Sequence, residues 1–502
     1  MLETITLENF KGFKELPELK IKPITILCGT NSCGKSSILQ SILLLKQTVE
    51  SKNPNQTLLL NGRFVHLGTF ENLIFEKKLE NNIVFNFCFK MPRRGVFTTR
   101  QKQMRLIPFP LILKEFISAE SFSIGQAEYF IHFKISLKTS ETKNLLKPII
   151  VDCLHFKMET QKPNKEIIPE ANIEINLEKN ELYKLRWENI HTRFIGGSDE
   201  QSGEATVKIN FANLFPISIY FQDESKENRR NSGIELALHR LTSLFQNIFS
   251  TYTYIGPLRE EPSRRYIYED EIVEIGIKGE NAAYICWDEQ DKTIENHYFY
   301  DENNNSFFEK QESLKLSQAL TTWLNLMKIK DLRPEPTNEI IYLNLNSSSA
   351  EKTRVSIADV GFGVSQIFPI VLEGLRMPKG NTLLLEQPEI HLHPNLQMQM
   401  ADYFISLALS NKRVIVETHS DHIINRLVRR IVEDEKYNLK ELIGIYFIKP
   451  TEKGSIYEEI CIDDKRGITN WPNDFFDQTA TEQEKILKAG LKKRKAEREK
   501  NL

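Results

Sequence analysis

Apolar and polar positions follow two periods along this chain, one typical of strands and one typical of helices. Near the N-terminus, short alternating strands lead to the apolar strand ITILC, and an apolar helix is expected from about Ser36 to Gln47. Much later, NTLLLEQPEIHLHP and RVIVETHSDHIINRL each contain an apolar strand, and LQMQMADYFISLAL between them has helical spacing. A strand, a helix and a strand in this order predict a parallel α/β sheet.

The middle of the chain follows the strand period, in segments such as EYFIHFKISLKT and IIVDCLHFKMET. This pattern predicts a β-rich insertion over roughly residues 115 to 225. Sustained heptads, which a long coiled coil requires, do not occur in the sequence. Two amphipathic helices are expected after the insertion, in SGIELALHRLTSLFQNIF and in LSQALTTWLNLM.

Composition narrows the class of protein. A chain of 502 residues with 40% hydrophobic residues can hold two to four domains, or one large domain with insertions. The formal charge of −2 indicates that any surface for nucleic acid is local. Six cysteines without disulfide or zinc spacing suit a reducing compartment, and no apolar run reaches the length of a membrane helix. We therefore expect a cytoplasmic protein.

The loop GTNSCGKS, residues 29–36, carries the strongest chemical signal. It fits the pattern GxxxxGKS between a strand and a helix, in which the loop's N–H groups surround phosphates, the lysine reaches the β and γ oxygens and the serine ligates magnesium. A chance match in a chain of this length is expected on the order of a few per cent of the time. The pattern predicts a site for ATP and Mg²⁺ formed by Gly29, Asn31, Ser32, Gly34, Lys35, Ser36 and Ser37.

Three further segments contain candidates for the rest of this site. ADVGFGVSQIFPIVLEGLR contains a turn that opens an apolar helix and can present N–H groups to an anion, with Gly361, Gly363 and Ser365 as candidates. Glu386 ends the strand in LLLEQPEIHLHP, and His419 lies at the end of the strand in RVIVETHSD.

In this order, the motifs resemble the ABC-type ATPases of the RecF, SMC and OLD group, in which two subunits sandwich ATP in a head-to-tail dimer. More closely, the chain is similar to a bacterial AAA-type ATPase family often found in phage-defence operons, with the Septu-type ATPase as the nearest kind. The segments that carry this resemblance run from residue 9 to residue 477 and are NFKGF, LNGRFVHLG, YIGPLREEPSRRY, IGIKGENAA, DVGFGVSQ, EQPEIHLHP, ETHSDHIINR and GITNWPNDFFD.

The resemblance implies an α/β fold, namely an ABC-type P-loop ATPase head with a mixed sheet flanked by helices and a β-rich insertion in place of a long coiled coil. The expected parts are an N-terminal half of the head with the P-loop (1–115), the β-rich and helical insertion (116–250), a linking region of mixed helices and strands (251–350), the C-terminal half of the head (351–450), and a strand pair with a basic tail (451–502).

The resemblance also implies roles for single residues. Glu386 matches the Walker B acid that holds magnesium, and His419 matches the switch histidine that contacts the γ-phosphate. Gln387 stands where relatives have the catalytic glutamate. Gly361 falls near the signature serine, which leaves Ser365 or backbone N–H groups to meet the partner's nucleotide. The segment after the first helix departs from the common pattern, so no Q-loop glutamine is assigned.

The glutamine at position 387 raises the question of which residue activates the attacking water. A glutamine can orient water for phosphoryl transfer, but it cannot take the proton, and a general base contributes about 10² to 10⁴ in rate. This substitution predicts slow hydrolysis and a persistent ATP-bound state. Glu389 is the alternative base, because it shares the face of Gln387 if the strand continues past Pro388. The other alternative is that Glu389 is an exposed turn residue.

Two other features have less specific patterns. The spacing of His391 and His393 is a weak metal signal, and their loop resembles the D-loop that crosses the dimer interface. The stretch RRGVFTTRQKQMR is a candidate for nucleic-acid contact, and so is the basic tail, with a solvated surface as the alternative for both. The basic residues of that stretch are Arg93, Arg94, Arg100, Lys102 and Arg105.

Three functional classes stay open at this point. The first is an ATP-gated dimer that acts as the sensor of a phage-defence complex and controls a partner effector, expected to be a nuclease. The second is a RecF-like ATPase that acts on host DNA. The third is an OLD-like nuclease. VIVETHSD is superficially similar to the opening of a TOPRIM fold, but IDDK further on is not the spaced acidic pair that such a nuclease uses.

Overall fold

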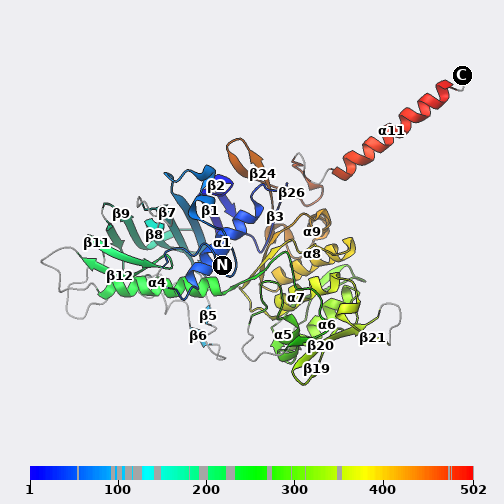
Figure 1. Ribbon diagram of the computed structural model, residues 1–502, viewed down its shortest axis with the longest axis horizontal. Coiled ribbons are helices and arrows are strands. Elements are labelled where there is room, and N and C mark those ends of the chain that lie inside the picture. Colours follow the sequence, from blue (N-terminus) through cyan, green and yellow to red (C-terminus); the bar gives the residue numbers. More distant parts are fainter. Residues whose placement is uncertain are drawn as a thin grey trace.

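The fold is built on two large sheets, which the computed structural model shows beside each other (Figure 1). In Figure 1 the N-terminal strands and the insertion lie on one side of the molecule and the C-terminal half lies on the other. The structure describes residues 1–53, 56–91, 96–98, 105–107, 116, 127–140, 149–179, 181–190, 202–221, 232–267, 274–295, 297–310, 313–347, 353–472, 475 and 478–500.

A six-stranded mixed sheet carries the P-loop. Its first five strands are parallel, and the last one pairs antiparallel with its neighbour. Its inner strands are buried on both faces, which explains their nearly continuous apolar sequences. The strand order is β13 (Tyr252–Ile255), β22 (Thr382–Glu386), β23 (Arg413–Glu417), β3 (Ile24–Gly29), β24 (Ile443–Thr451) and β25 (Gly454–Glu459).

Helices flank this sheet, so the predicted α/β fold class with a mixed sheet is confirmed. The strand, helix and strand expected late in the chain are β22, α8 and β23, with the two strands parallel. Because the carboxyl ends of parallel strands meet at one edge, the P-loop and the turns after β22 and β23 lie at the same edge of the sheet. The helices are α1 (Lys35–Val49), α7 (Gly363–Arg376), α8 (Pro394–Leu409) and α9 (Asp421–Glu433).

The second sheet has nine strands and is antiparallel throughout. The strands of the predicted β-rich insertion extend the sheet that the N-terminal strands begin, and both share one hydrophobic core. The order is β12 (Phe215–Phe221), β11 (Gly203–Ala212), β10 (Leu182–Glu188), β9 (Ile167–Leu177), β8 (Ile149–Gln161), β7 (Glu128–Thr139), β4 (Ile83–Met91), β1 (Leu2–Phe10) and β2 (Phe13–Lys20).

The predicted amphipathic helix after the insertion is α4 (Ser232–Ser250). Its Phe245 packs against Phe89, Phe133 and Phe215, which belong to three strands of the nine-stranded sheet. In Figure 1 this helix runs along the insertion toward the six-stranded sheet. Burying its apolar face on these aromatic side chains is the main contribution to its stability.

A second hydrophobic core lies on the other side of the six-stranded sheet. It contains the helices α5 (Ala282–Asp288) and α6 (Leu316–Leu326), the hairpin of β16 (His297–Asp301) and β17 (Ser306–Lys310), and the strands β19 (Arg333–Thr337), β20 (Ile340–Asn346) and β21 (Arg354–Ser356). The C-terminal helix α11 (Gln478–Lys500) projects away from the rest of the chain (Figure 1).

The remaining elements are short. They are β5 (Val96–Thr98), β6 (Arg105–Ile107), β14 (Tyr266–Ile267), β15 (Thr293–Ile294), β18 (Leu314–Lys315), β26 (Ile462–Asp463), β27 (Gly467–Ile468), α10 (Leu439–Leu442) and the 3-10 helices Phe70–Asn72, Phe75–Lys77 and Ile357–Asp359. No helix in the described part of the chain is both long and apolar enough to cross a membrane.

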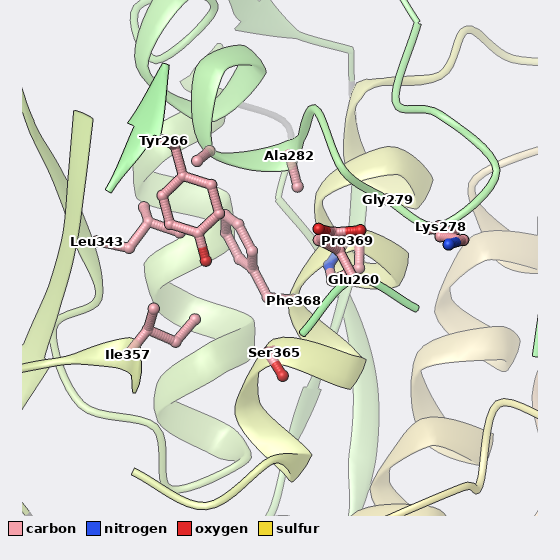
Figure 2. Close-up of a pocket in the computed structure, with 11 residues that line it drawn as sticks. Glu260, Tyr266, Lys278, Gly279, Ala282, Leu343, Ile357, Ser365, Phe368 and Pro369 are labelled. Carbon is pink, nitrogen blue, oxygen red and sulfur yellow. The ribbon is translucent and has the colours of Figure 1, made fainter. Parts of the chain in front are cut away.

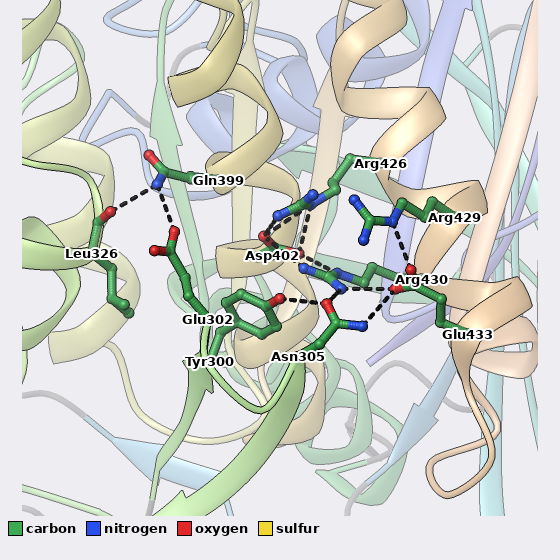
Figure 3. Close-up of polar contacts among 10 residues, drawn as sticks. All are labelled: Tyr300, Glu302, Asn305, Leu326, Gln399, Asp402, Arg426, Arg429, Arg430 and Glu433. Atoms are coloured by element: carbon green, nitrogen blue, oxygen red, sulfur yellow. Dashed lines mark hydrogen bonds and ion pairs between the residues drawn. The ribbon is translucent and has the colours of Figure 1, made fainter.

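A buried polar network joins α8, α9 and the β16–β17 hairpin (Figure 3). Asp402 of α8 accepts hydrogen bonds from Arg426, at 2.8 Å, and from Arg430, at 2.7 Å. Arg430 also donates a hydrogen bond to Asn305 in the hairpin, and its guanidinium lies over the ring of Tyr300. Because α8 follows β22 and α9 follows β23, this network fixes the helices that leave the candidate site.

Replacing Asp402 by Asn is expected to lower the free energy of unfolding by about 3 to 5 kcal/mol, because the buried Arg430 and the partly buried Arg426 then lose the charge of Asp402. Urea denaturation monitored by circular dichroism measures this change. The matched control is Glu482→Gln, which removes an exposed ion pair with Lys485 and is expected to change stability by less than about 1 kcal/mol. Equal effects of the two substitutions would contradict a structural role for the network.

Candidate nucleotide site

The P-loop backbone has the shape that its glycines permit. Gly29 and Gly34 have positive φ angles of 146° and 98°, and a Cβ atom on Gly29 would lie 2.1 Å from the carbonyl oxygen of Ile448. Gly34 caps α1 in the left-handed conformation. The Lys35 ammonium is held above the loop by the carbonyl oxygen of Thr30, at 2.6 Å. The dihedral angles therefore favour glycine at both positions, and at Gly29 the close approach of the backbone of Ile448 requires it as well.

Ser36 contacts an acid that the sequence analysis did not single out. Its hydroxyl donates to Glu417 Oε1 at 2.8 Å, and Glu417 is only 3% exposed. The other carboxylate oxygen, Oε2, is buried without a partner among the described residues. Burial raises the pKa of Glu417. The signal for this residue was present, because Glu417 ends an apolar strand just as Glu386 does.

Glu386 lies at the end of the neighbouring strand β22. The hydroxyl of Tyr254 donates to its Oε1 at 3.0 Å. Burial, and then the charge of Glu417, raise the pKa of Glu386 to about 7, while the charge of Lys11 acts in the opposite direction. Lys11, in the turn between β1 and β2, donates to Gln40 of α1. The buried Glu417, the partly buried Glu386 and Lys11 therefore lie beside the P-loop.

These oxygens fit a magnesium ion. Mg²⁺ prefers hard oxygen ligands and commonly takes one or two carboxylates together with phosphate oxygens and water. Ser36 Oγ and the carboxylates of Glu386 and Glu417 offer such ligands, and the unpartnered Oε2 of Glu417 has no other hydrogen bond to lose. Ser36, Glu386 and Glu417 are thus the residues that would hold the ion.

Gln387 lies in a tight turn, here called the Gln387 turn (residues 386–392). Its φ angle of 46° is left-handed, and its N–H donates to the carbonyl oxygen of Glu417 at 2.7 Å. Strand β22 ends at Glu386, so the strand does not continue to Glu389. The condition under which Glu389 would share the face of Gln387 is therefore not met.

Glu389 instead joins the Gln387 turn to the loop after β23, here called the His419 loop (residues 417–420). Its carboxylate accepts from the hydroxyl of Thr418 at 2.8 Å and from the backbone N–H of His419 at 2.6 Å. The side chain is partly buried, so its interpretation as an exposed turn residue is wrong. Charge-assisted hydrogen bonds of this kind fix the relative position of two loops.

His419 itself lies near the P-loop. The residue is exposed, but partial loss of solvent around its imidazole, together with the positive charge of Lys35, lowers the pKa of His419. A neutral imidazole at this place can donate one hydrogen bond to a phosphate oxygen. The structure thus brings His419 to the same edge of the sheet as Lys35, Ser36, Glu386 and Gln387.

The turn before α7 contacts the Gln387 turn. Gly363 starts α7, and a Cβ atom there would lie 3.2 Å from the carbonyl oxygen of His391. Gly361 has no atom of another residue within 4 Å of a Cβ position. The hydroxyl of Ser365 donates to the carbonyl oxygen of Phe362 at 2.8 Å, and this exposed phenylalanine ring lies against His391.

Ser365 also lines a small pocket beside the start of α7 (Figure 2). Figure 2 shows Ser365 at one end of the group of lining residues, which also includes Glu260 and Pro369. The second core contributes Tyr266 and Phe368 to the pocket lining, which also includes Lys278 and Gly279. Ser365 thus has a hydrogen-bond partner within its own chain, and its contact with a partner's nucleotide stays a prediction.

Two other sequence features can now be placed. His393 caps α8, because its Nδ1 accepts from the backbone N–H of Asn395 at 3.2 Å. Within the described ranges, no group of three or more His, Cys, Asp or Glu side chains is arranged to hold a metal. Of the candidate basic residues, Arg105 begins β6, but its side chain is outside the described part of the structure. The other four lie entirely outside the described residues; they are Arg93, Arg94, Arg100 and Lys102.

A strand, a P-loop and a helix, with two acids at the ends of adjacent strands, define a P-loop nucleoside triphosphatase. A family model described as AAA ATPase domain matches residues 1–424, and one described as protein of unknown function (DUF3696) matches residues 440–486. Because the first match covers most of the sequence, the chain belongs to the AAA ATPase domain family. No curated protein sequence matches it.

Among solved structures, the chain is similar to the SMC head domain from Thermotoga maritima, at 9% identity and a TM-score of 0.34, over 92% of this chain and 99% of that one. It is also similar to the SmcHead bound to the C-winged helix domain of ScpA, at 10% and 0.37, over 92% and 98%. A third is the Smc head domain bound to the C-terminal domain of ScpA derived from Pyrococcus furiosus, at 9% and 0.34, over 91% and 96%. The family assignment does not depend on these scores.

Proposed function

We propose that this ATPase is a nucleotide-gated switch that binds MgATP, dimerises around it and hydrolyses it slowly. The ATP-bound homodimer, or a higher even oligomer, acts as the sensor and regulatory subunit of an anti-phage defence complex and controls a partner effector, a nuclease. The observation that carries the switch is that Gln387 follows Glu386 at the end of β22. The defence role rests on the sequence motifs alone.

The amide of Gln387 can orient an attacking water but cannot accept its proton. Glu389, three residues after the magnesium candidate Glu386, already accepts two hydrogen bonds from the His419 loop. Its carboxylate is thereby directed at the protein instead of at a water molecule. This arrangement supports slow hydrolysis, since a general base contributes about 10² to 10⁴ in rate.

The other residues of the site bind and orient the nucleotide. The P-loop N–H groups and Lys35 hold the phosphates, and Mg²⁺ bound by Ser36, Glu386 and Glu417 would neutralise charge on the phosphate oxygens. His419 donates a hydrogen bond to the γ-phosphate, so its loop moves when that phosphate leaves. Glu389 passes this movement to the Gln387 turn, which contacts the start of α7.

Gly361→Trp is expected to abolish ATP-dependent dimerisation at protein concentrations where the wild type is fully dimeric. In the proposed dimer, the turn before α7 approaches the nucleotide of the partner closely. Apart from its two chain neighbours, no residue lies within 4 Å of a Cβ atom at Gly361, so we expect the fold to tolerate the indole. Mass photometry with a slowly hydrolysed ATP analogue measures the fraction of dimer.

The matched control is Gly490→Trp, which places the same bulk at another open glycine, in the exposed helix α11. This variant should dimerise like the wild type, and Gly361→Trp should retain its ATP affinity. An unchanged dimer fraction for Gly361→Trp would refute the sandwich arrangement, as would a wild-type oligomer that does not respond to nucleotide.

A further inference from the structure

Arg259 lies in the segment that leaves β13 next to the Gln387 turn. β13 pairs in parallel with β22, with Ile255 opposite Leu385, so the two chains leave the sheet side by side. The segment is fixed on its other side, because the N–H groups of Gly256 and Glu260 donate to the carbonyl oxygens of Ile277 and Lys278, at 2.8 Å and 2.9 Å. Its position beside the turn is thus set by the sheet and by the loop that contains Ile277 and Lys278.

The guanidinium of Arg259 holds the first two residues of the Gln387 turn. The side chain is 5% exposed, and its Nη2 donates to the carbonyl oxygens of both Glu386 and Gln387, at 3.1 Å each. The Nε and Nη1 groups are buried without partners among the described residues. Burial lowers the pKa of Arg259 to about 10, so the group is still charged at neutral pH.

This contact stabilises an unfavourable backbone conformation. A left-handed φ angle is unfavourable for a residue other than glycine, and Gln387 has a φ angle of 46°. One donor that bridges two consecutive carbonyl oxygens restricts the peptide between them. The positive charge of Arg259 also attracts the Glu389 carboxylate, which holds Thr418 and the N–H of His419.

We propose that Arg259 is a positioning residue for ATP hydrolysis, which fixes Gln387 and, through Glu389, the His419 loop in the geometry that orients the attacking water. This inference rests on the proposed function, because it requires hydrolysis at this site. Arg259 acts through the Gln387 turn, and no contact with the nucleotide is needed. Its loss should therefore slow hydrolysis without weakening ATP binding.

The test compares Arg259→Gln and Arg259→Lys with the wild type and with Arg264→Gln. Arg264 is the control, because it lies in the same segment but is exposed and pairs with Asp359. Three quantities are measured on each full-length protein: the single-turnover hydrolysis rate, the Kd of a fluorescent ATP analogue, and deuterium uptake in peptides that cover residues 386–392.

Arg259→Gln is expected to slow hydrolysis at least tenfold, to change the Kd less than threefold, and to increase uptake in the Gln387 turn. Arg259→Lys should recover part of the rate, because lysine keeps the charge but lacks the planar fork of arginine. Arg264→Gln should match the wild type. An unchanged rate, or unchanged uptake in the turn, would overturn the proposal, as would a Kd that weakens in parallel with the rate.

A failure of the proposed function gives a different result. If the wild type does not hydrolyse ATP, the ATPase mechanism is wrong, and with it the role of Arg259 in hydrolysis. If the wild type hydrolyses ATP and the Arg259 variants hydrolyse it at the same rate as the wild type and Arg264→Gln, the proposed function stands. Arg259 is then not a positioning residue. If Arg259→Gln does not fold, the Arg259→Lys variant decides by the same three measurements.

Discussion

Lys35→Ala is expected to weaken ATP binding by at least about 10²-fold and to abolish hydrolysis with it. Lys35 is buried, and its ammonium lies over the P-loop on the carbonyl oxygen of Thr30, where the phosphates of a nucleotide would also lie. A charge-assisted contact of a buried ammonium with phosphate contributes roughly 3 kcal/mol, which corresponds to about a hundredfold in Kd. Isothermal titration with ATP and Mg²⁺ measures the loss.

The control for Lys35→Ala is Lys14→Ala, which removes an exposed lysine of β2 and should leave the Kd unchanged. Circular dichroism and thermal unfolding of both variants establish that the fold is intact. ATP affinity that survives in a folded Lys35→Ala protein would show that the nucleotide binds elsewhere.

Gln387→Glu is expected to accelerate hydrolysis by up to about 10²-fold, because a carboxylate beside the attacking water can accept its proton. A phosphate-release assay on the purified variants measures this rate. The opposite result follows if Glu389 is the base. Gln387→Glu would then have little effect or slow the reaction, because it crowds another negative charge next to Glu386 and Glu417.

Glu389 can be tested with a pair of variants that separates its two roles. Glu389→Gln removes the carboxylate, whereas Thr418→Val removes only the hydroxyl that donates to it. If Glu389 holds the His419 loop, the two variants should lower the rate by similar, modest factors. If Glu389 accepts the proton, Glu389→Gln should stop hydrolysis while Thr418→Val retains most of it.

Local pattern accounts for the parts of the fold that were predicted well. The period of apolar positions and the Gly-rich loop predicted α1, α4, α8 and the strands β22 and β23, and the structure confirms them. The residues Gly29, Gly34 and Lys35 could be named because the loop that binds phosphate is continuous in the sequence and strand-to-helix context limits its shape.

Contacts between distant segments account for what was missed. Nothing local indicates that β7 pairs with β4, which joins the insertion to the N-terminal strands in one sheet. Likewise, the hydrogen bond between Ser36 and Glu417 forms because β23 lies next to β3. The sequence shows a P-loop serine and an acid at the end of a strand, but it does not show that the two strands are neighbours. Arg259 lies in YIGPLREEPSRRY, one of the segments that carry the family resemblance, but no role could be assigned to it from the sequence, because its contacts depend on the backbone of the Gln387 turn.

The position of Glu389 illustrates the same limit. Whether it shares a face with Gln387 depends on one dihedral angle, and the left-handed φ of Gln387 ends the strand alternation. Pro388 restricts the backbone of Gln387, which is consistent with the end of the strand at this point, but it does not determine the φ angle of Gln387. The Glu389 carboxylate then finds its partners in the His419 loop, which is 30 residues away along the chain.

The lifetime of the ATP-bound dimer tests the central claim most directly. Wild-type protein and Gln387→Glu are loaded with MgATP, free nucleotide is removed rapidly, and the dimer fraction is followed over time by mass photometry. Because slow hydrolysis maintains the switch, the wild-type dimer should persist at least ten times longer than the Gln387→Glu dimer. Equal lifetimes for the two proteins, or a wild-type dimer that decays as soon as ATP is removed, would contradict the role assigned to Gln387.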